Sequence, residues 1–242
     1  ALVAYRDRTD LDALATLLRD WDRRFERTSS AAVAFHGYNF FLARRVLADD
    51  FSLVFDPILG ESPGFMFKFL VLALRLPDGA GTFLQEGRSL LAVQALEDTA
   101  AWLTTRFGSS DPAGYAWGDV HFTCFRAVVP SLDGGCVATD GGEGTVNVSG
   151  TNFFGSGGMP RDRFESGGGS IYRLTAGFTP EGRPQAFINF PRGVSGDPAS
   201  PFWNDRTGDW TENRYRELLF ERAAIETDAA TPAGGGTLTI AP

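Results

Sequence analysis

The chain has 242 residues, of which 43% are hydrophobic and 13% aromatic, so it can bury a substantial core and is not expected to be disordered. The formal net charge of -8 argues against a nucleic acid as partner, because nothing would offset repulsion from the phosphates. No signal peptide is visible, and the most apolar stretch, 65–74, is too short to span a membrane, so no membrane partner is expected.

Region 1–110 is predicted to be helical. Four segments carry apolar residues at helical spacing, and capping residues mark some of their ends: Thr9-Asp10 before the first, Ser29-Ser30 before the second and Gly108 after the fourth. These segments are residues 10–25, 30–48, 62–76 and 86–107. No charge block or Pro-rich linker divides the chain, which predicts a single packed unit.

Region 111–242 is predicted to be rich in β-structure, with short apolar runs between glycine clusters. The predicted strands are 117–129, 144–149, 170–178 and 185–190, joined by long loops. We interpret the glycine clusters as turns, because no Lys-Ser or Lys-Thr follows them as a phosphate-binding loop requires. The fold class is therefore α+β, with a helical first half and antiparallel strands plus long loops in the second.

Cys124 and Cys136 are the only cysteines, and the Pro and Gly-Gly between them would allow a hairpin that brings them together. Two interpretations stay open at this point: a disulfide, or two buried free thiols. His36 and His121 lie far apart in the sequence and belong to no ligand motif, so no metal site is predicted.

Two residues are weighed as catalytic groups. Ser195 follows a glycine as in a nucleophile elbow, but Asp197 stands where that motif needs glycine, so we interpret Ser195 as a loop serine. His121 could act as a general base, since histidine titrates near neutrality, but a hydrogen-bonded structural histidine is the favoured interpretation.

Two further patterns receive structural interpretations. The carboxylates of Asp205, Asp209 and Glu212 lack the spacing of a calcium-binding EF-hand loop, so we interpret them as a solvated acidic loop. Asn147-Val148-Ser149 fits a glycosylation sequon, although such triplets are common by chance.

Four motifs occur in a fixed order along the chain. They are Trp117-Gly118-Asp119-Val120-His121, Gly144-Thr145-Val146-Asn147, Ser170-Ile171-Tyr172-Arg173, and the segment Pro-Arg-Gly-Val-Ser-Gly-Asp-Pro-Ala-Ser-Pro-Phe-Trp-Asn-Asp at 191–205, which is followed by Trp210, Tyr215 and Leu218-Leu219-Phe220. Together they resemble the C-terminal signature of the penicillin acylase family. Phe202-Trp203 departs from it, because the family usually has His-Tyr there.

The resemblance implies the C-terminal part of the large (β) subunit of an N-terminal-nucleophile hydrolase, whose fold is an αββα four-layer sandwich. It implies that strands 170–178 and 185–190 join the antiparallel core sheet. The loop 191–205 would then form part of the active-site wall. Gly193 and Gly196 would suit close backbone approach in that loop, and Pro198 and Pro201 would hold it extended.

In this family the nucleophile is an N-terminal residue whose own α-amino group acts as the base. This chain begins with Ala1, which has no nucleophilic side chain, so no catalytic residue is carried over. No substrate-binding residue and no metal ligand is assigned. No cofactor is required, and the family's calcium carboxylates belong to a segment missing from this chain.

The function implied is that of one part of a processed amide hydrolase, inactive alone, whose nucleophile lies on another segment. Such an acylase removes a hydrophobic acyl group from an amine such as a β-lactam, an acyl-homoserine lactone or a lipopeptide. The expected partners are the small-molecule amide substrate and other processed chains of the same precursor. A periplasmic or secreted location is implied, which favours the Cys124–Cys136 disulfide. The alternative is a non-catalytic binding module that retains the C-terminal half of the fold.

Overall fold

The computed structural model describes residues 8–56, 63–77, 83–142, 144–150 and 160–229. The chain separates into two compact units, Ala1–Ser170 and Ile171–Pro242. The change from helices to strands near residue 110 lies inside the first unit, so the predicted regions 1–110 and 111–242 do not coincide with these units. The prediction of a single packed unit with a missing partner segment stays a prediction.

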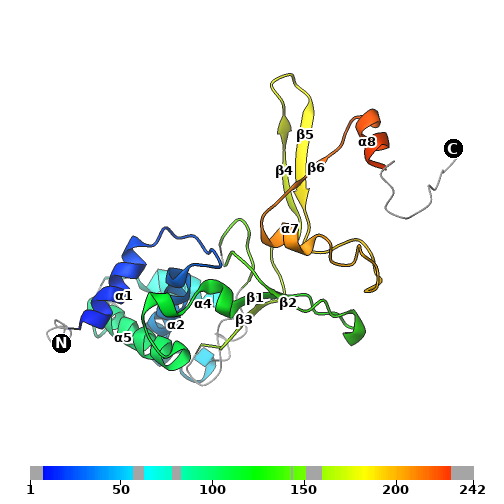
Figure 1. Cartoon of the computed structure of the whole chain (residues 1–242). Coiled ribbons are helices and arrows are strands. Elements are labelled where there is room, and N and C mark those ends of the chain that lie inside the picture. Colours follow the sequence, from blue (N-terminus) through cyan, green and yellow to red (C-terminus); the bar gives the residue numbers. More distant parts are fainter. Residues whose placement is uncertain (1–7, 57–62, 78–82, 143, 151–159, 230–242) are drawn as a thin grey trace. The chain divides into compact units, whose positions relative to one another are not determined.

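The helical half of the first unit is built around one long central helix (Figure 1). Helix α2 packs against the other three, and its buried side chains form much of the apolar core of this unit. The four helices are α1 (Thr9–Asp20), α2 (Ser30–Phe51), α4 (Pro63–Ala73) and α5 (Arg88–Phe107), and a 3-10 turn, η2 (Ser52–Val54), follows α2. The four predicted helices are confirmed, with shifted ends.

The largest shift is at the end of α1, which stops at Asp20 rather than at the predicted residue 25. Asp22 accepts a hydrogen bond from the Arg24 amide, and Arg23 adopts a left-handed backbone with φ 65°. Both features favour a turn over a helix. The apolar residues beyond Asp20 therefore face the core from a loop.

Both predicted caps of the other long helices are present. The Ser29 side chain accepts a hydrogen bond from the Ala32 amide at the start of α2. Gly108 ends α5 in the left-handed conformation with φ 80°, and its N–H donates to the carbonyl of Thr104. These residues fix where each helix begins or ends.

The first unit also contains a three-stranded mixed sheet in the order β2-β1-β3. Strand β1 (His121–Cys124) pairs antiparallel with β2 (Cys136–Ala138) and parallel with β3 (Phe164–Ser166). The expectation of antiparallel strands is therefore wrong for the β1–β3 pair. This sheet holds both cysteines and His121.

Two strand predictions in this unit are wrong in extent or in kind. Residues 117–129 form only the four-residue strand β1, preceded by helix α6 (Trp117–Val120), because the Asp119 carboxylate accepts the Ala116 amide and starts a helical turn. Residues 144–149 form a turn and a single bridge, Ser149 to Gly169. The Thr145 hydroxyl bonds both backbone groups of Gly142, which favours that turn.

The second unit contains an antiparallel sheet in the order β4-β5-β6. Strands β4 (Arg173–Phe178) and β5 (Pro184–Asn189) form a hairpin, which confirms the predicted strands 170–178 and 185–190 to within three residues. The short strand β6 (Arg216–Leu218) pairs with β5. Among the described strands, β4 pairs only with β5, so its outer edge carries no strand.

The remaining described elements are short: η3 (Pro112–Gly114), η4 (Pro130–Leu132), α7 (Thr207–Thr211) and α8 (Arg222–Ala229). None of the helices in the described ranges has the length and apolar character needed to cross a membrane. The structure is thus α+β, with a helical first half and two small sheets.

Candidate functional site

The Trp-Gly-Asp-Val-His motif lies at the centre of a buried aromatic stack in the first unit. The Trp117 indole lies between two imidazoles, with ring centroids 4.8 Å from His36 and 4.6 Å from His121 and interplanar angles of 23° and 17°. Phe25 and Phe164 contact the same indole. Both histidines of the chain are therefore part of the core, although 85 positions separate them in the sequence (121 minus 36).

Hydrogen bonds join this motif to the glycine-rich segment that follows it. The Trp117 indole N–H donates to the carbonyl of Gly141 over 2.9 Å. A Cβ on Gly141, whose φ is +89°, would lie 2.2 Å from the carbonyl oxygen of Asn147, so these two backbones touch. Gly141 thus contacts both Trp117 of the first motif and Asn147 of the second, and it holds the two motifs together.

A chain of buried hydroxyls leads away from His121. The His121 Nδ1–H donates to the Thr139 carbonyl over 2.9 Å, and this contact fixes the tautomer, since a carbonyl only accepts. The hydroxyls of Thr139, Thr123 and Ser149 are hydrogen-bonded in sequence, at 3.0 and 2.7 Å. Because Ser149 is 1% exposed, this network stabilises the fold and does not reach solvent.

Burial keeps both imidazoles neutral. It lowers the pKa of His36 to about 3, and repulsion from His121 adds to the effect. Burial also lowers the pKa of His121, although hydrogen bonds to backbone groups such as Thr139 act in the opposite direction. His121 is fully buried and hydrogen-bonded, so the structure agrees with the structural role and gives it no access to a substrate.

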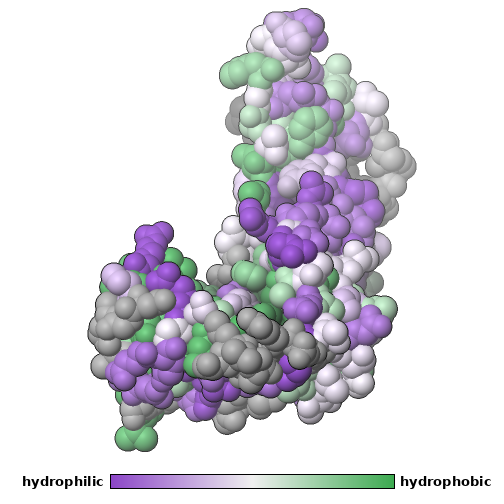
Figure 2. Space-filling view, turned by 90° about the vertical axis from the view of Figure 1, so that its left-hand side faces the viewer, coloured by the Kyte–Doolittle hydropathy of each residue, from purple (hydrophilic) through white to green (hydrophobic). Residues whose placement is uncertain are grey.

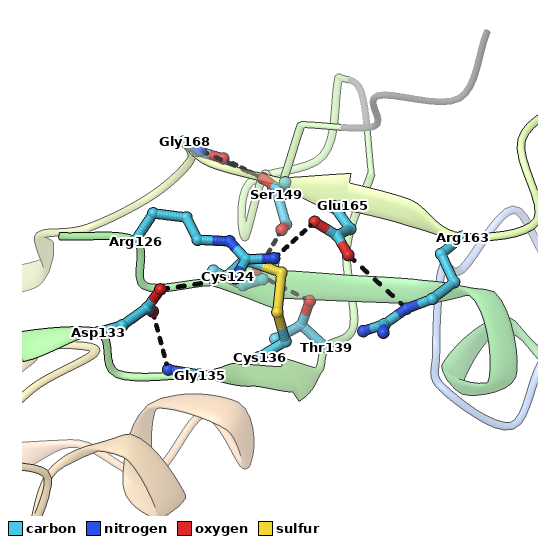
Figure 3. The surroundings of a disulfide bond; sticks show 12 residues. Cys124, Arg126, Asp133, Gly135, Cys136, Thr139, Ser149, Arg163, Glu165 and Gly168 are labelled. Carbon is cyan, nitrogen blue, oxygen red and sulfur yellow. Dashed lines mark hydrogen bonds and ion pairs between the residues drawn. A yellow bond between two sulfur atoms is a disulfide. The ribbon is translucent and has the colours of Figure 1, made fainter. Parts of the chain in front are cut away.

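Cys124 and Cys136 form a disulfide in the structure (Figure 3). They lie directly opposite each other on β1 and β2, with their Cα atoms 4.1 Å apart. The Glu165 carboxylate of β3 lies beside them and is held by Arg126 at 3.0 Å and Arg163 at 3.8 Å.

In the second unit, Arg173 joins the third motif to the fourth. Its guanidinium lies 4.5 Å from the centre of the Trp210 ring and donates to the Trp210 carbonyl and to the Asn213 side chain. Asn189 of β5 donates to the carbonyl of Asp209, next to Trp210. Since Arg173 and Trp210 are both buried, this contact anchors the sheet to helix α7.

The loop 191–205 folds back on itself at Gly193. A Cβ there would lie 1.9 Å from the Phe202 carbonyl oxygen and 2.4 Å from the Asp205 carboxylate, so only glycine fits. Gly196 has open space around it, so the expected close approach holds for Gly193 alone. The Ser195 hydroxyl accepts a hydrogen bond from the Asp197 backbone amide, which is a local turn contact. No histidine or carboxylate among the described residues is hydrogen-bonded to this hydroxyl.

The acidic residues of the second unit do not gather into a cation site within the described ranges. Asp209 pairs with Arg214 at 3.0 Å and Arg216 at 3.2 Å, and hydrogen bonds from these two arginines lower its pKa. A cavity of about 590 Å³ opens beside these groups, between β5, β6 and α8. Its lining mixes apolar side chains with paired charges and contains no serine, threonine, cysteine or histidine, so it offers no nucleophile.

Two residues near these clusters were not predicted from the sequence. His36 gave no signal, because it lies on a helix that is buried on several faces. Glu165 lies in a three-residue strand, too short to be recognised by alternation. Ser149, the last residue of the predicted sequon, is buried and bonded to Thr123.

Comparison with known proteins identifies a family and similar solved structures. Residues 2–227 match the family described as Penicillin amidase. No curated protein matches the chain. Among solved structures, the chain is similar to a thermostable penicillin G acylase from Alcaligenes faecalis, with 15% sequence identity and a TM-score of 0.46. The match covers 96% of this chain and 43% of the acylase chain.

Proposed function

The chain belongs to the penicillin amidase family, and from this we propose that it is one part of a processed amide hydrolase whose nucleophile lies on another segment. The whole enzyme would cleave a hydrophobic acyl group from an amine, such as a β-lactam, an acyl-homoserine lactone or a lipopeptide. No cofactor takes part in the reaction, and any calcium would be bound by the other segment.

The observation that carries this proposal is that the four motifs serve as scaffold. The Trp117 indole N–H donates a hydrogen bond to the Gly141 carbonyl, and the Arg173 guanidinium stacks on the Trp210 ring. Ser149 and His121, at the two ends of the hydroxyl network, are buried in the core. A hydrolase built from this scaffold therefore needs a nucleophile and an oxyanion site from elsewhere.

The second unit supports a missing partner segment. Leu174 and Phe178, on the same face of β4, are 48% and 79% exposed. On the face shown in Figure 2, apolar side chains of this unit are open to solvent among polar ones. A further layer of the αββα sandwich would bury them, and a strand of the antiparallel core sheet would pair with the outer edge of β4.

The Cys124–Cys136 disulfide supports a periplasmic or secreted location, because disulfides persist in oxidising compartments. The partners of the chain would then be other processed chains of the same precursor. The alternative function is a non-catalytic binding module, and the cavity between β5, β6 and α8 is the observation that favours it.

The proposal is tested on the complete gene product with N-acyl amides of increasing acyl length, by measuring amine release. We expect hydrolysis by the complete product, none by this chain alone, and unchanged hydrolysis in the Ser195→Ala variant. Loss of activity in that variant would contradict the interpretation of Ser195 as a structural loop serine. No hydrolysis of any amide would favour the binding module.

A further inference from the structure

The surroundings of the disulfide contain a set of metal ligands that three different strands bring together. The two sulfurs of Cys124 and Cys136 and a carboxylate oxygen of Glu165 all lie within 4.8 Å of one another. Cys124 comes from β1, Cys136 from its antiparallel neighbour β2, and Glu165 from its parallel neighbour β3. Because the sheet fixes all three strands, the three side chains remain neighbours when the disulfide is reduced.

Thiolates and carboxylates are ligands of zinc, and two cysteines with one carboxylate leave the fourth tetrahedral position to water. Two sulfurs on one zinc ion lie roughly 3.8 Å apart, from Zn–S bonds of about 2.3 Å at a tetrahedral angle. The cysteines face each other with Cα atoms 4.1 Å apart, so rotation of the side chains provides this separation without moving the strands.

The charges around the site suit a divalent cation. Two thiolates, one carboxylate and one divalent cation together carry a single negative charge. Arg126 and Arg163, both paired with Glu165, offset this remaining negative charge.

We infer that Cys124, Cys136 and Glu165 form a binding site for a zinc-like divalent cation when the disulfide is reduced. Strands β1 and β2 are then cross-linked either by the disulfide or by the metal ion, and the two cross-links exclude each other. This site is independent of the proposed amide hydrolysis and involves none of its expected groups.

A phosphine serves as the reductant of the disulfide. The phosphine and one water convert the disulfide into two thiols and become the phosphine oxide. Binding of the cation then releases the two thiol protons. The disulfide form offers no thiolate and is expected to bind no cation at this position.

The test uses the complete gene product and Co²⁺, whose bonds to thiolates absorb strongly in the near ultraviolet. Reduced protein is expected to bind one Co²⁺ per chain with this absorption, and oxidised protein is expected to show no such absorption. In the Glu165→Gln variant, the affinity of the reduced protein for Co²⁺ should fall by at least about tenfold. Even mutation of a residue that only hydrogen-bonds to a metal ligand lowers metal affinity by that factor.

Asp133→Asn is the matched control, because Asp133 also pairs with Arg126 but does not belong to the converging set. It should bind Co²⁺ like the wild type, with the same circular dichroism spectrum. The inference is overturned if reduced wild-type protein shows no thiolate-to-cobalt absorption. It is equally overturned if Glu165→Gln and Asp133→Asn bind Co²⁺ with equal affinity.

Discussion

At Gly193 the loop 191–205 folds back so closely that a side chain has no room. A methyl group would overlap the Phe202 carbonyl and the Asp205 carboxylate. We expect Gly193→Ala to lower the free energy of unfolding by about 1–3 kcal/mol or more, as overpacking does. Urea denaturation measures this, and Gly196→Ala, in open space, should change it by less than about 0.5 kcal/mol. Equal effects of the two variants would contradict the loop geometry.

His36 makes stability depend on pH. Burial lowers its pKa to about 3, below the ordinary value near 6.5, so the unfolded chain takes up a proton that the folded chain does not. The stabilisation is therefore complete above about pH 6.5 and is lost as the pH falls towards 3. For this one group, the free energy of unfolding changes with pH by at most about 1.4 kcal/mol per pH unit.

The His36→Phe variant keeps an aromatic ring beside Trp117 but cannot take up a proton. Chemical denaturation between about pH 4 and 7 should show a smaller slope than in the wild type. Tyr38→Phe is the control from the same helix, because burial raises the pKa of Tyr38 and keeps it neutral throughout this range. An unchanged slope in His36→Phe would mean that His36 is not neutral in the folded chain.

At the scale of elements, the disulfide closes the β1–β2 hairpin across a sequence separation of 12 residues. Its removal by Cys124→Ser and Cys136→Ser should lower the free energy of unfolding of the first unit by about 2–4 kcal/mol, because the unfolded chain gains freedom. Trp fluorescence during urea unfolding checks this. Identical midpoints for the double variant and the oxidised protein would contradict it.

The helices could be predicted from the sequence because their information is local. Periodic leucines and the caps at Ser29 and Gly108 lie within or next to the helix they define. The hairpin β4–β5 was predictable for the same reason. Strands β2, β3 and β6 have three residues each, and their pairing partners hold them in place, so no periodicity reveals them.

The candidate site could be predicted less well. The motifs were found, but the reason for each became visible only in three dimensions: Arg173 stacks on Trp210, and Trp117 reaches Gly141. Glu165 lies beside the cysteines because β3 runs parallel to β1, and a parallel pairing leaves no local mark in the sequence.

Across the whole molecule, several large apolar side chains of the described residues are exposed. Phe178 and Val194 of the second unit are 79% and 88% exposed, and β4 has an open edge within the described part of the sheet. We expect this chain, produced alone, to aggregate, since such edges pair with other chains. Light scattering during refolding measures it, and a stable monomer would favour the binding module.

Under the proposed function, this chain is one piece of a processed amide hydrolase, and another segment carries the nucleophile. Intact mass spectrometry of the natural gene product, purified and then denatured, tests this proposal. We expect a processed chain whose first residue is Ser, Thr or Cys, the residues that act as N-terminal nucleophiles. A stable species with the 26.2 kDa mass of this chain and no companion would contradict the claim.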